Sequence, residues 1–221
     1  DPTTFADAQE ILRRYQIQPT QAIQKLLEAA EEETPKPGED FFSKNQARLV
    51  ATPQLMLEAA AKEAEKQGIK PIILSDRIEG EAKEVAKVHA AIAKQIKHRD
   101  QPINSPAVIL SGGETTVTVH GKGKGGRNTE FILSLLEALQ GDEEISAIAV
   151  DTDGIDGTED NAGAWIDHNT FFKAKQLNLK TNDFLDNNDA YTFFKQLDHL
   201  VITGPTMTNV NDFRAIFIGQ P

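Results

Sequence analysis

The sequence contains no cysteine, which excludes a disulfide framework, a thiolate metal site and a cysteine nucleophile, and which fits a reducing cytoplasm. It also lacks any uninterrupted apolar run near the ~18 residues of a membrane span, so we expect a soluble protein without a membrane partner. Basic residues are scarce, since 23 Lys and Arg stand against 34 Asp and Glu and give a net charge of −11. A broad basic surface for nucleic acid is therefore not expected.

The sequence does not begin with methionine but opens as DPTTFADA, and we therefore expect a piece of a longer polypeptide. In residues 19–33 the apolar positions follow helical spacing behind Pro19. The segment TPKPGED that follows contains two prolines and a glycine, a composition typical of a linker. We predict a helical segment and linker over residues 1–38 and one α/β domain over residues 39–221.

From about residue 47, strand patterns alternate with helix patterns. Helices are predicted at 53–67, 79–97 and 128–140, with Thr52 and Pro53 as a helix start. Strands are predicted at ARLVA (47–51), PIILS (71–75), PAVILS (106–111), TTVTVH (115–120) and ISAIAV (145–150), and also in AGAWID, HLVITG and FRAIFI. The alternation predicts a three-layer α/β/α fold with a mixed, mainly parallel sheet, in which SGGE turns the chain between two antiparallel strands.

In folds of this kind, ligands bind at the carboxyl ends of the strands. Four polar loops follow predicted strands: SGGE (111–114), GKGKGGRN (121–128), DTDGIDG (151–157) and GPTMTNVND (204–212). The second loop is basic and the third is acidic. A basic loop beside an acidic one suits a phosphate and its metal ion.

The basic loop leaves three interpretations open. Gly121, Gly123 and Gly126 satisfy G-x-G-x-x-G between a predicted strand and a predicted helix, the context of a dinucleotide site. However, Asp151 lies 25 residues after Gly126, beyond the ~20 expected for a ribose contact. A Walker A loop is excluded, because the segment ends in Arg and Asn where Lys and Ser or Thr are needed. Dinucleotide binding, another mode of phosphate binding and a solvent-exposed hairpin remain alternatives.

The acidic loop carries Asp151, Asp153 and Asp156. An EF-hand is excluded, since Ile155 and Ala162 occupy positions that need oxygen ligands. Because Mg²⁺ needs only one or two protein carboxylates when phosphates supply the rest, the three aspartates are candidate Mg²⁺ ligands. The alternative is that they stabilise turns.

Other side chains carry weaker signals. His89 and His98 lie on a charged helix face and are predicted to be solvent-exposed, whereas Trp165 is predicted to belong to the core. His120, beside the glycine loop, either contacts a ligand or ends a strand.

Three blocks in order, SGGETTVTVHGKGKGGRNTEF, AVDTDGIDGTEDNAGA and GPTMTNVND, together resemble the signature of the glycerate 2-kinase (MOFRL-type) family, some of whose members are named hydroxypyruvate reductases. The opening DPTTFADA and the segment EGEAKEVA resemble it as well. Family members are much longer, and their amino-terminal portion forms most of another α/β domain across the active-site cleft. The resemblance therefore implies a missing amino-terminal domain as the partner of this chain.

The resemblance implies ATP-dependent phosphorylation of D-glycerate to 2-phosphoglycerate, with Mg²⁺, in the cytoplasm. Lys124 and Arg127 are then expected to stabilise the transferring phosphate oxygens, while Asp151, Asp153 or Asp156 holds Mg²⁺ or receives the hydroxyl proton. Glu114 is a second candidate for metal ligand or base. Expected substrate and phosphate contacts are Gly112, Gly113, Lys122, Gly123, Gly125, Gly126, Asn128, Thr208, Asn209 and Asn211.

Two alternatives to a kinase remain. One is an NAD(P)H-dependent reductase of hydroxypyruvate, which shares the three-carbon acid but needs no metal for hydride transfer. The other is a folded fragment that is inactive by itself. The nucleotide preference and assembly into a homo-oligomer are left open by the sequence.

Overall fold

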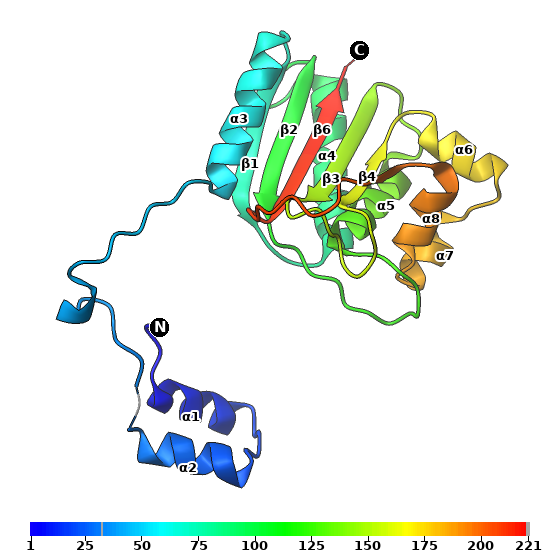
Figure 1. Ribbon diagram of the computed structural model, residues 1–221. Helices are drawn as coiled ribbons and strands as arrows, with labels where there is room; N and C mark the ends of the chain where they lie inside the picture. Colours follow the sequence, from blue (N-terminus) through cyan, green and yellow to red (C-terminus); the bar gives the residue numbers. More distant parts are fainter. Residues whose placement is uncertain (32, 220–221) are drawn as a thin grey trace. The chain divides into compact units, whose positions relative to one another are not determined.

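The computed structural model describes residues 1–31 and 33–219. The chain divides into two compact units after Leu49 (Figure 1). The boundary predicted from the linker composition lay earlier, after residue 38. Residues 47–51, predicted to be a strand, form none, and Leu49 and Val50 are 82% and 86% exposed. This prediction was wrong because a short apolar run without a neighbouring strand has no ladder to join.

The first unit is helical. Helix α1 (Phe5–Arg14) starts at a capping box in which Thr4 and Asp7 accept each other's backbone N–H groups. Helix α2 (Gln21–Ala29) is capped by Thr20, and a 3-10 turn, η1, spans Asp40–Phe42. Neither α1 nor α2 contains a buried residue. Phe5, Leu12 and Leu27 are partly buried, whereas Ile11 and Leu26 are more than half exposed.

The second unit is built on a sheet of six strands in the order β1-β2-β6-β3-β4-β5. Its strands are β1 (Lys70–Ile78), β2 (Ala107–Gly113), β3 (Ile145–Asp151), β4 (Gly163–Ile166), β5 (Leu200–Val201) and β6 (Asp212–Ile218). Strands β1 and β2 pair in parallel, and every other neighbouring pair is antiparallel. In the described part of the chain, β1, β2, β3 and β5 thus run one way and β4 and β6 the other. The predicted mixed sheet is confirmed, but its pairing is mostly antiparallel because β6 lies between β2 and β3 and β4 lies between β3 and β5.

Helices cover both faces of the sheet, which confirms the three-layer α/β/α fold (Figure 1). The helices are α3 (Pro53–Lys66), α4 (Ala82–Arg99), α5 (Arg127–Leu139), α6 (Thr170–Gln176), α7 (Thr181–Asp186) and α8 (Ala190–Leu197). On one face α3 packs Leu57 against Val108 and Leu110 of β2. On the other face α4, α5 and α8 bury a larger apolar core. Helix α3 starts at Thr52, followed by Pro53, as predicted.

The segment after β2 differs from its predicted strand. Residues 115–120 form a single bridge, between Thr116 and Glu81, instead of a strand. Gly113 has φ +120, and a Cβ there would lie 2.2 Å from the backbone nitrogen of Ile78. The chain leaves the sheet at this glycine and runs beside the start of α4, where the Ala82 N–H donates to the Thr116 carbonyl (2.9 Å). The alternation of polar and apolar residues therefore led to the wrong prediction of a strand in this extended loop.

Among residues 1–31 and 33–219, none of the helices has both the length and the apolar composition of a membrane span.

Candidate functional site

The sheet brings three strand ends to one edge. Because β6 runs antiparallel between β2 and β3, its first residue, Asp212, pairs with Gly113 at the end of β2 and with Asp151 at the end of β3. Helix α5 begins at the same edge with Arg127. Residues from distant parts of the sequence thus converge, as expected for strand ends in an α/β fold.

Arg127 is surrounded by carboxylates. Its Nε donates to Oδ1 of Asp212 (2.7 Å), its Nη2 donates to Oδ2 of Asp151 (2.6 Å), and its Nη1 lies 3.6 Å from Oε1 of Glu114. Burial acts to lower the pKa of Arg127, but these carboxylates outweigh burial and raise it. The side chain is 25% exposed. The site therefore presents a permanently charged guanidinium whose orientation is fixed from several sides.

Behind Arg127 lies a buried ion pair that the sequence reasoning did not select. Asp212 and Arg214 are both fully buried, and Nη2 of Arg214 donates to Oδ2 of Asp212. The backbone N–H of Thr115 donates to the same oxygen (3.2 Å). One sequence signal was available: Asp212 and Arg214 occupy inward positions of a strand whose other inward residues are apolar. Charges at such positions are paired in folded proteins.

The glycine loop is explained by close packing of backbones. A Cβ at Gly121 would lie 2.1 Å from the carbonyl oxygen of Asn187, and one at Gly123 would lie 2.3 Å from Cβ of Asp189. A Cβ at Gly126 would lie 2.5 Å from the carbonyl carbon of Asp156. The three glycines of the G-x-G-x-x-G pattern are therefore required by neighbouring protein segments, which removes the main support for a dinucleotide fingerprint.

The backbone N–H groups of this loop also have partners within the chain. The Gly121 N–H donates to Oδ1 of Asn188 (2.9 Å), and the Lys122 N–H donates to Oδ1 of Asn187 (3.1 Å). The Gly123 N–H donates to the Asn187 carbonyl (2.9 Å). These amides already have acceptors, so they do not form a cradle for a phosphate. The side chain of Lys122 is exposed, and its predicted contact with phosphate stays a prediction.

Lys124 is exposed and forms an ion pair with Glu159 (3.2 Å). Exposed pairs of this kind contribute little to stability. Its Nζ therefore remains able to exchange Glu159 for another anion, and its predicted role stays a prediction.

The three aspartates of the acidic loop have different surroundings. Asp156 is 1% exposed; its Oδ1 accepts from the Asn128 N–H (2.9 Å) and its Oδ2 from the Thr129 N–H (2.8 Å). It therefore caps α5, which differs from its predicted role as a metal ligand. Asp151 pairs with Arg127, and burial raises the pKa of Asp151 to about 6 although the guanidinium opposes the shift. Asp153 accepts from the Ile155 N–H (2.9 Å).

Residues 1–31 and 33–219 contain no group of three or more His, Cys, Asp or Glu side chains that could hold a metal ion. The predicted role of Asp151, Asp153 or Asp156 as an Mg²⁺ ligand stays a prediction. Mg²⁺ with phosphate ligands requires only one or two protein carboxylates, so Asp153 and Asp151 still fit that smaller requirement.

The loop 204–211 packs on the acidic loop. Nδ2 of Asn209 donates to Oδ2 of Asp153 (3.3 Å), while Oδ1 of Asn209 accepts from the Asn211 N–H (2.9 Å). Asn211 has φ +63, and the Thr208 N–H donates to the Thr206 hydroxyl (3.4 Å). These contacts are those of turn formers. Contacts of Thr208, Asn209 and Asn211 with a substrate stay predictions.

Three other residues that were predicted to contact a ligand are buried in the fold. Gly112 and Gly113 are buried in β2. Asn128 is fully buried, and its Nδ2 donates to Asp212 (2.8 Å) and Asp156 (3.3 Å). These three residues support the site from behind, and their predicted contacts with substrate or phosphate stay predictions.

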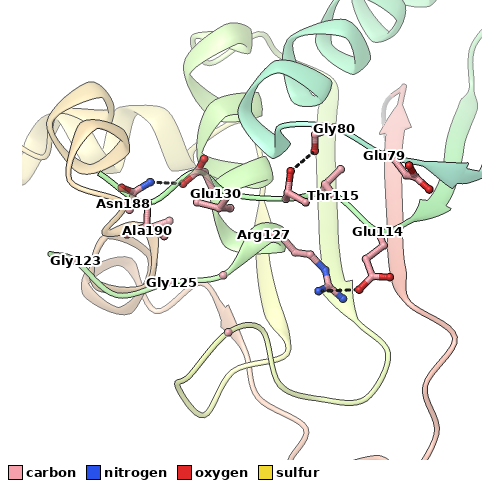
Figure 2. Close-up of a pocket in the computed structure, with 15 residues that line it drawn as sticks. Glu79, Gly80, Glu114, Thr115, Gly123, Gly125, Arg127, Glu130, Asn188 and Ala190 are labelled. Atoms are coloured by element: carbon pink, nitrogen blue, oxygen red, sulfur yellow. Dashed lines mark hydrogen bonds and ion pairs between the residues drawn. The ribbon is translucent and has the colours of Figure 1, made fainter. Parts of the chain in front are cut away.

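A cavity of about 660 Å³ lies in front of Arg127 (Figure 2). Its lining includes the predicted Glu114, Gly123, Gly125, Gly126 and Arg127. It also includes residues that sequence reasoning missed, namely Glu79, Thr115, Glu130 and Asn188. Figure 2 shows Arg127 with Glu114 in one part of the cavity and Glu130 with Asn188 in another.

Glu130 is the most enclosed acid in this cavity, with 3% exposure. Nδ2 of Asn188 donates to its Oε2 (3.0 Å). Burial raises the pKa of Glu130. No sequence pattern distinguished Glu130 from the other polar residues of its helix.

His89 is buried, contrary to prediction, with 2% exposure. Its Nδ1 is 2.8 Å from the Val85 carbonyl oxygen and its Nε2 is 3.0 Å from the Ser111 hydroxyl. Burial lowers the pKa of His89 to about 4. Trp165 is half-buried and stacks on His199, with ring centroids 3.9 Å apart.

Comparison with known proteins agrees with this architecture. Residues 107–212 match the model of the MOFRL family. The crystal structure of glycerate kinase from Thermotoga maritima superposes with a TM-score of 0.85 and 35% identity, covering 99% of this chain and 51% of that one. A Pyrococcus horikoshii structure gives a TM-score of 0.80 at 36% identity, covering 100% of this chain and 51% of that one. The fold is thus that of the glycerate kinase structures.

Curated relatives carry two kinds of name. The "D-glycerate 2-kinase" of Thermotoga maritima is 36% identical over 212 residues, 96% of this chain and 49% of the relative. A "Putative hydroxypyruvate reductase" of Agrobacterium vitis is 48% identical over 221 residues, 99% of this chain and 50% of the relative. Residues 107–212 thus match the MOFRL family, and the chain is similar to glycerate 2-kinases over about half of their length, as its three motif blocks indicated. It spans about half the length of the curated relatives it matches.

Proposed function

We propose that this chain forms one side of the active site of an ATP-dependent glycerate 2-kinase, which converts D-glycerate to 2-phosphoglycerate. The observation that carries the proposal is the setting of Arg127, a guanidinium fixed by Asp212 and Asp151 at the wall of a 660 Å³ cavity. Phosphoryl transfer depends on positioned cations that neutralise developing charge on the phosphate oxygens. The kinase names of several relatives support the same reaction.

Within this proposal Arg127 faces the transferring phosphate. Its Nη1 edge has only a loose partner, because Glu114 is 3.6 Å away and its side chain is 59% exposed. A phosphate oxygen can therefore displace Glu114 without breaking the tighter contacts of Arg127. Lys122 and Lys124 add exposed positive charge from the adjoining loop. Glu114 is then a candidate acceptor for the hydroxyl proton of glycerate.

Two of the three candidate aspartates are suited to bind Mg²⁺. Asp153, with Asp151 beside it, would hold the ion, and Asp156 would not because its oxygens cap α5. When bound, Mg²⁺ would neutralise charge on the phosphates of ATP. Thr208, Asn209 and Asn211 remain the proposed contacts for the carboxylate and hydroxyls of glycerate.

A second domain completes the proposed site. The relatives are about twice as long as the matched region, which supports a partner domain across the cavity. We assign residues 1–38 to the connection with that domain, since α1 and α2 contain no buried residue. The complete enzyme below means this chain together with that domain.

Product analysis tests the proposal. The complete enzyme is incubated with ATP, Mg²⁺ and D-glycerate, and the phosphoglycerate isomer is identified by phosphorus NMR. We expect 2-phosphoglycerate. In parallel, the enzyme is incubated with hydroxypyruvate and NADH or NADPH in the presence of a chelator, and the nicotinamide absorbance is followed. Chelator-resistant oxidation of the nicotinamide without any phosphoglycerate would establish the reductase instead.

A further inference from the structure

Strand β6 places two charges in the interior. Asp212 and Arg214 both point to the face covered by α5, and both are fully buried. A buried charge is costly unless it is paired and hydrogen-bonded. Two apolar side chains at these positions would stabilise the core at least as well as the ion pair. We therefore look for the role of the pair in the contacts of Asp212.

The two oxygens of Asp212 face different groups. Oδ1 accepts from Nε of Arg127 (2.7 Å) and from Nδ2 of Asn128 (2.8 Å), at the start of α5. Oδ2 accepts from the Thr115 N–H (3.2 Å) and from Nη2 of Arg214. Donors on both sides prevent the carboxylate from rotating, so the position of Oδ1 is determined by the contacts of Oδ2.

Arg214 is itself held in place. Its Nη2 donates to the Thr115 hydroxyl (2.9 Å), its Nη1 donates to the Gly112 carbonyl (3.4 Å), and its guanidinium lies 5.1 Å from the centre of the Phe131 ring. These contacts join β2, β6 and α5 around one group. Arg214 therefore supports Asp212 with a rigid, planar donor that is isolated from solvent.

We infer that Asp212, held by Arg214, is a positioning residue that sets the plane of the Arg127 guanidinium toward the cavity. Asp212 fixes the Nε edge, which directs the two Nη groups to Asp151 and to the cavity side, where Glu114 lies (Figure 2). A guanidinium binds phosphate through a planar fork, so its orientation decides whether both donors reach the oxygens. The link to phosphoryl transfer rests on the proposed function; the positioning itself does not.

The test requires a variant that keeps the fold. Asp212→Asn alone leaves Arg214 as an unpaired buried cation, a change that commonly unfolds a domain. The double variant Asp212→Asn with Arg214→Met removes both charges together. The matched control is Asp142→Asn, which removes the ion-pair partner of Lys97. Asp142 precedes β3 and therefore lies at the opposite end of that strand from Asp151.

The first readout is independent of activity. Hydrogen exchange at Nε of Arg127 is measured by nitrogen NMR in the 221-residue chain and in both variants. We expect a protected Nε–H in the wild type and in Asp142→Asn, and exchange at least about tenfold faster in the double variant, because a charge-assisted hydrogen bond is lost. Equal protection in the folded double variant would overturn the inference.

The second readout is kinetic and uses the complete enzyme. We expect the double variant to lower kcat by about 10- to 100-fold while KM for glycerate changes less than about twofold, since the defect lies in charge stabilisation. An unchanged kcat would also overturn the inference. If the wild-type enzyme forms no phosphoglycerate at all, the proposed function fails, and the exchange measurement alone decides whether Asp212 positions Arg127.

Discussion

Gly126 and Asp156 lie in direct backbone contact, so that a Cβ at Gly126 would come within 2.5 Å of the Asp156 carbonyl carbon. The same aspartate caps α5 through the N–H groups of Asn128 and Thr129. We therefore predict that Gly126→Ala lowers the free energy of unfolding by roughly 2 to 4 kcal/mol, since neither backbone can move without losing the cap. Urea denaturation measures the loss.

Gly68→Ala is the matched control for this substitution. Gly68 has φ +76 and no atom within 4 Å of its ideal Cβ, so alanine there meets only the backbone penalty of about 1 kcal/mol. If Gly126→Ala lowers the free energy of unfolding no more than Gly68→Ala does, close packing does not explain Gly126. A ligand-binding role of the loop would then be the better explanation.

His89 makes the stability of the domain depend on pH. Its pKa is about 4 in the folded protein against 6.5 as the ordinary value, so the unfolded chain binds more protons between these values. The free energy of unfolding should therefore fall as pH falls from 6.5 through 4, by up to about 3 kcal/mol from this residue. Urea denaturation at several pH values between 4 and 7 measures it.

The comparison variant is His89→Gln, which removes the titration. Asp151 acts in the opposite sense, because its pKa is raised to about 6 and its contribution to stability is lost as pH rises through that value. Only the difference between wild type and variant isolates His89. Identical pH dependence of the two proteins would contradict the buried, neutral histidine described above.

Much of the fold could be predicted from periodicity and caps. The start of α3 at Thr52 and Pro53 and the strands β2 and β3 were predicted because buried strands and capped helices have strong local signals. The strand predicted at residues 115–120 was wrong, because the same alternation of polar and apolar residues occurs in a strand and in an extended loop. Whether a segment pairs with a neighbouring strand depends on that neighbour and cannot be predicted from the segment alone.

The site was predicted only in part for a related reason. The motifs identified Arg127 and Asp151, because cationic and acidic residues at strand ends are visible in sequence. Asp212 and Arg214 escaped notice, since their importance comes from burial and from the insertion of β6 between β2 and β3. Likewise, the G-x-G-x-x-G pattern suggested a ligand-binding loop. In the structure, Gly121 and Gly123 are instead explained by the close approach of residues 187–189.

The isolated chain should lack glycerate kinase activity. In the proposed enzyme the chain supplies one side of the cleft, and catalysis by positioning loses its effective concentration when the other side is absent. ATP-dependent turnover of D-glycerate by the purified 221-residue chain, compared with the complete enzyme under the same conditions, measures this. Comparable turnover would show that a partner domain is unnecessary.

Substitution of Arg127 in the complete enzyme tests the central claim most directly. Arg127→Ala should lower kcat for phosphorylation of D-glycerate by about 10² to 10³, the range for loss of a charge-stabilising donor. Arg127→Lys should not restore it, because lysine lacks the planar fork that Asp212 and Asp151 hold. Circular dichroism confirms that each variant is folded. A folded Arg127→Ala enzyme with wild-type kcat would contradict the assignment of this guanidinium to the reaction.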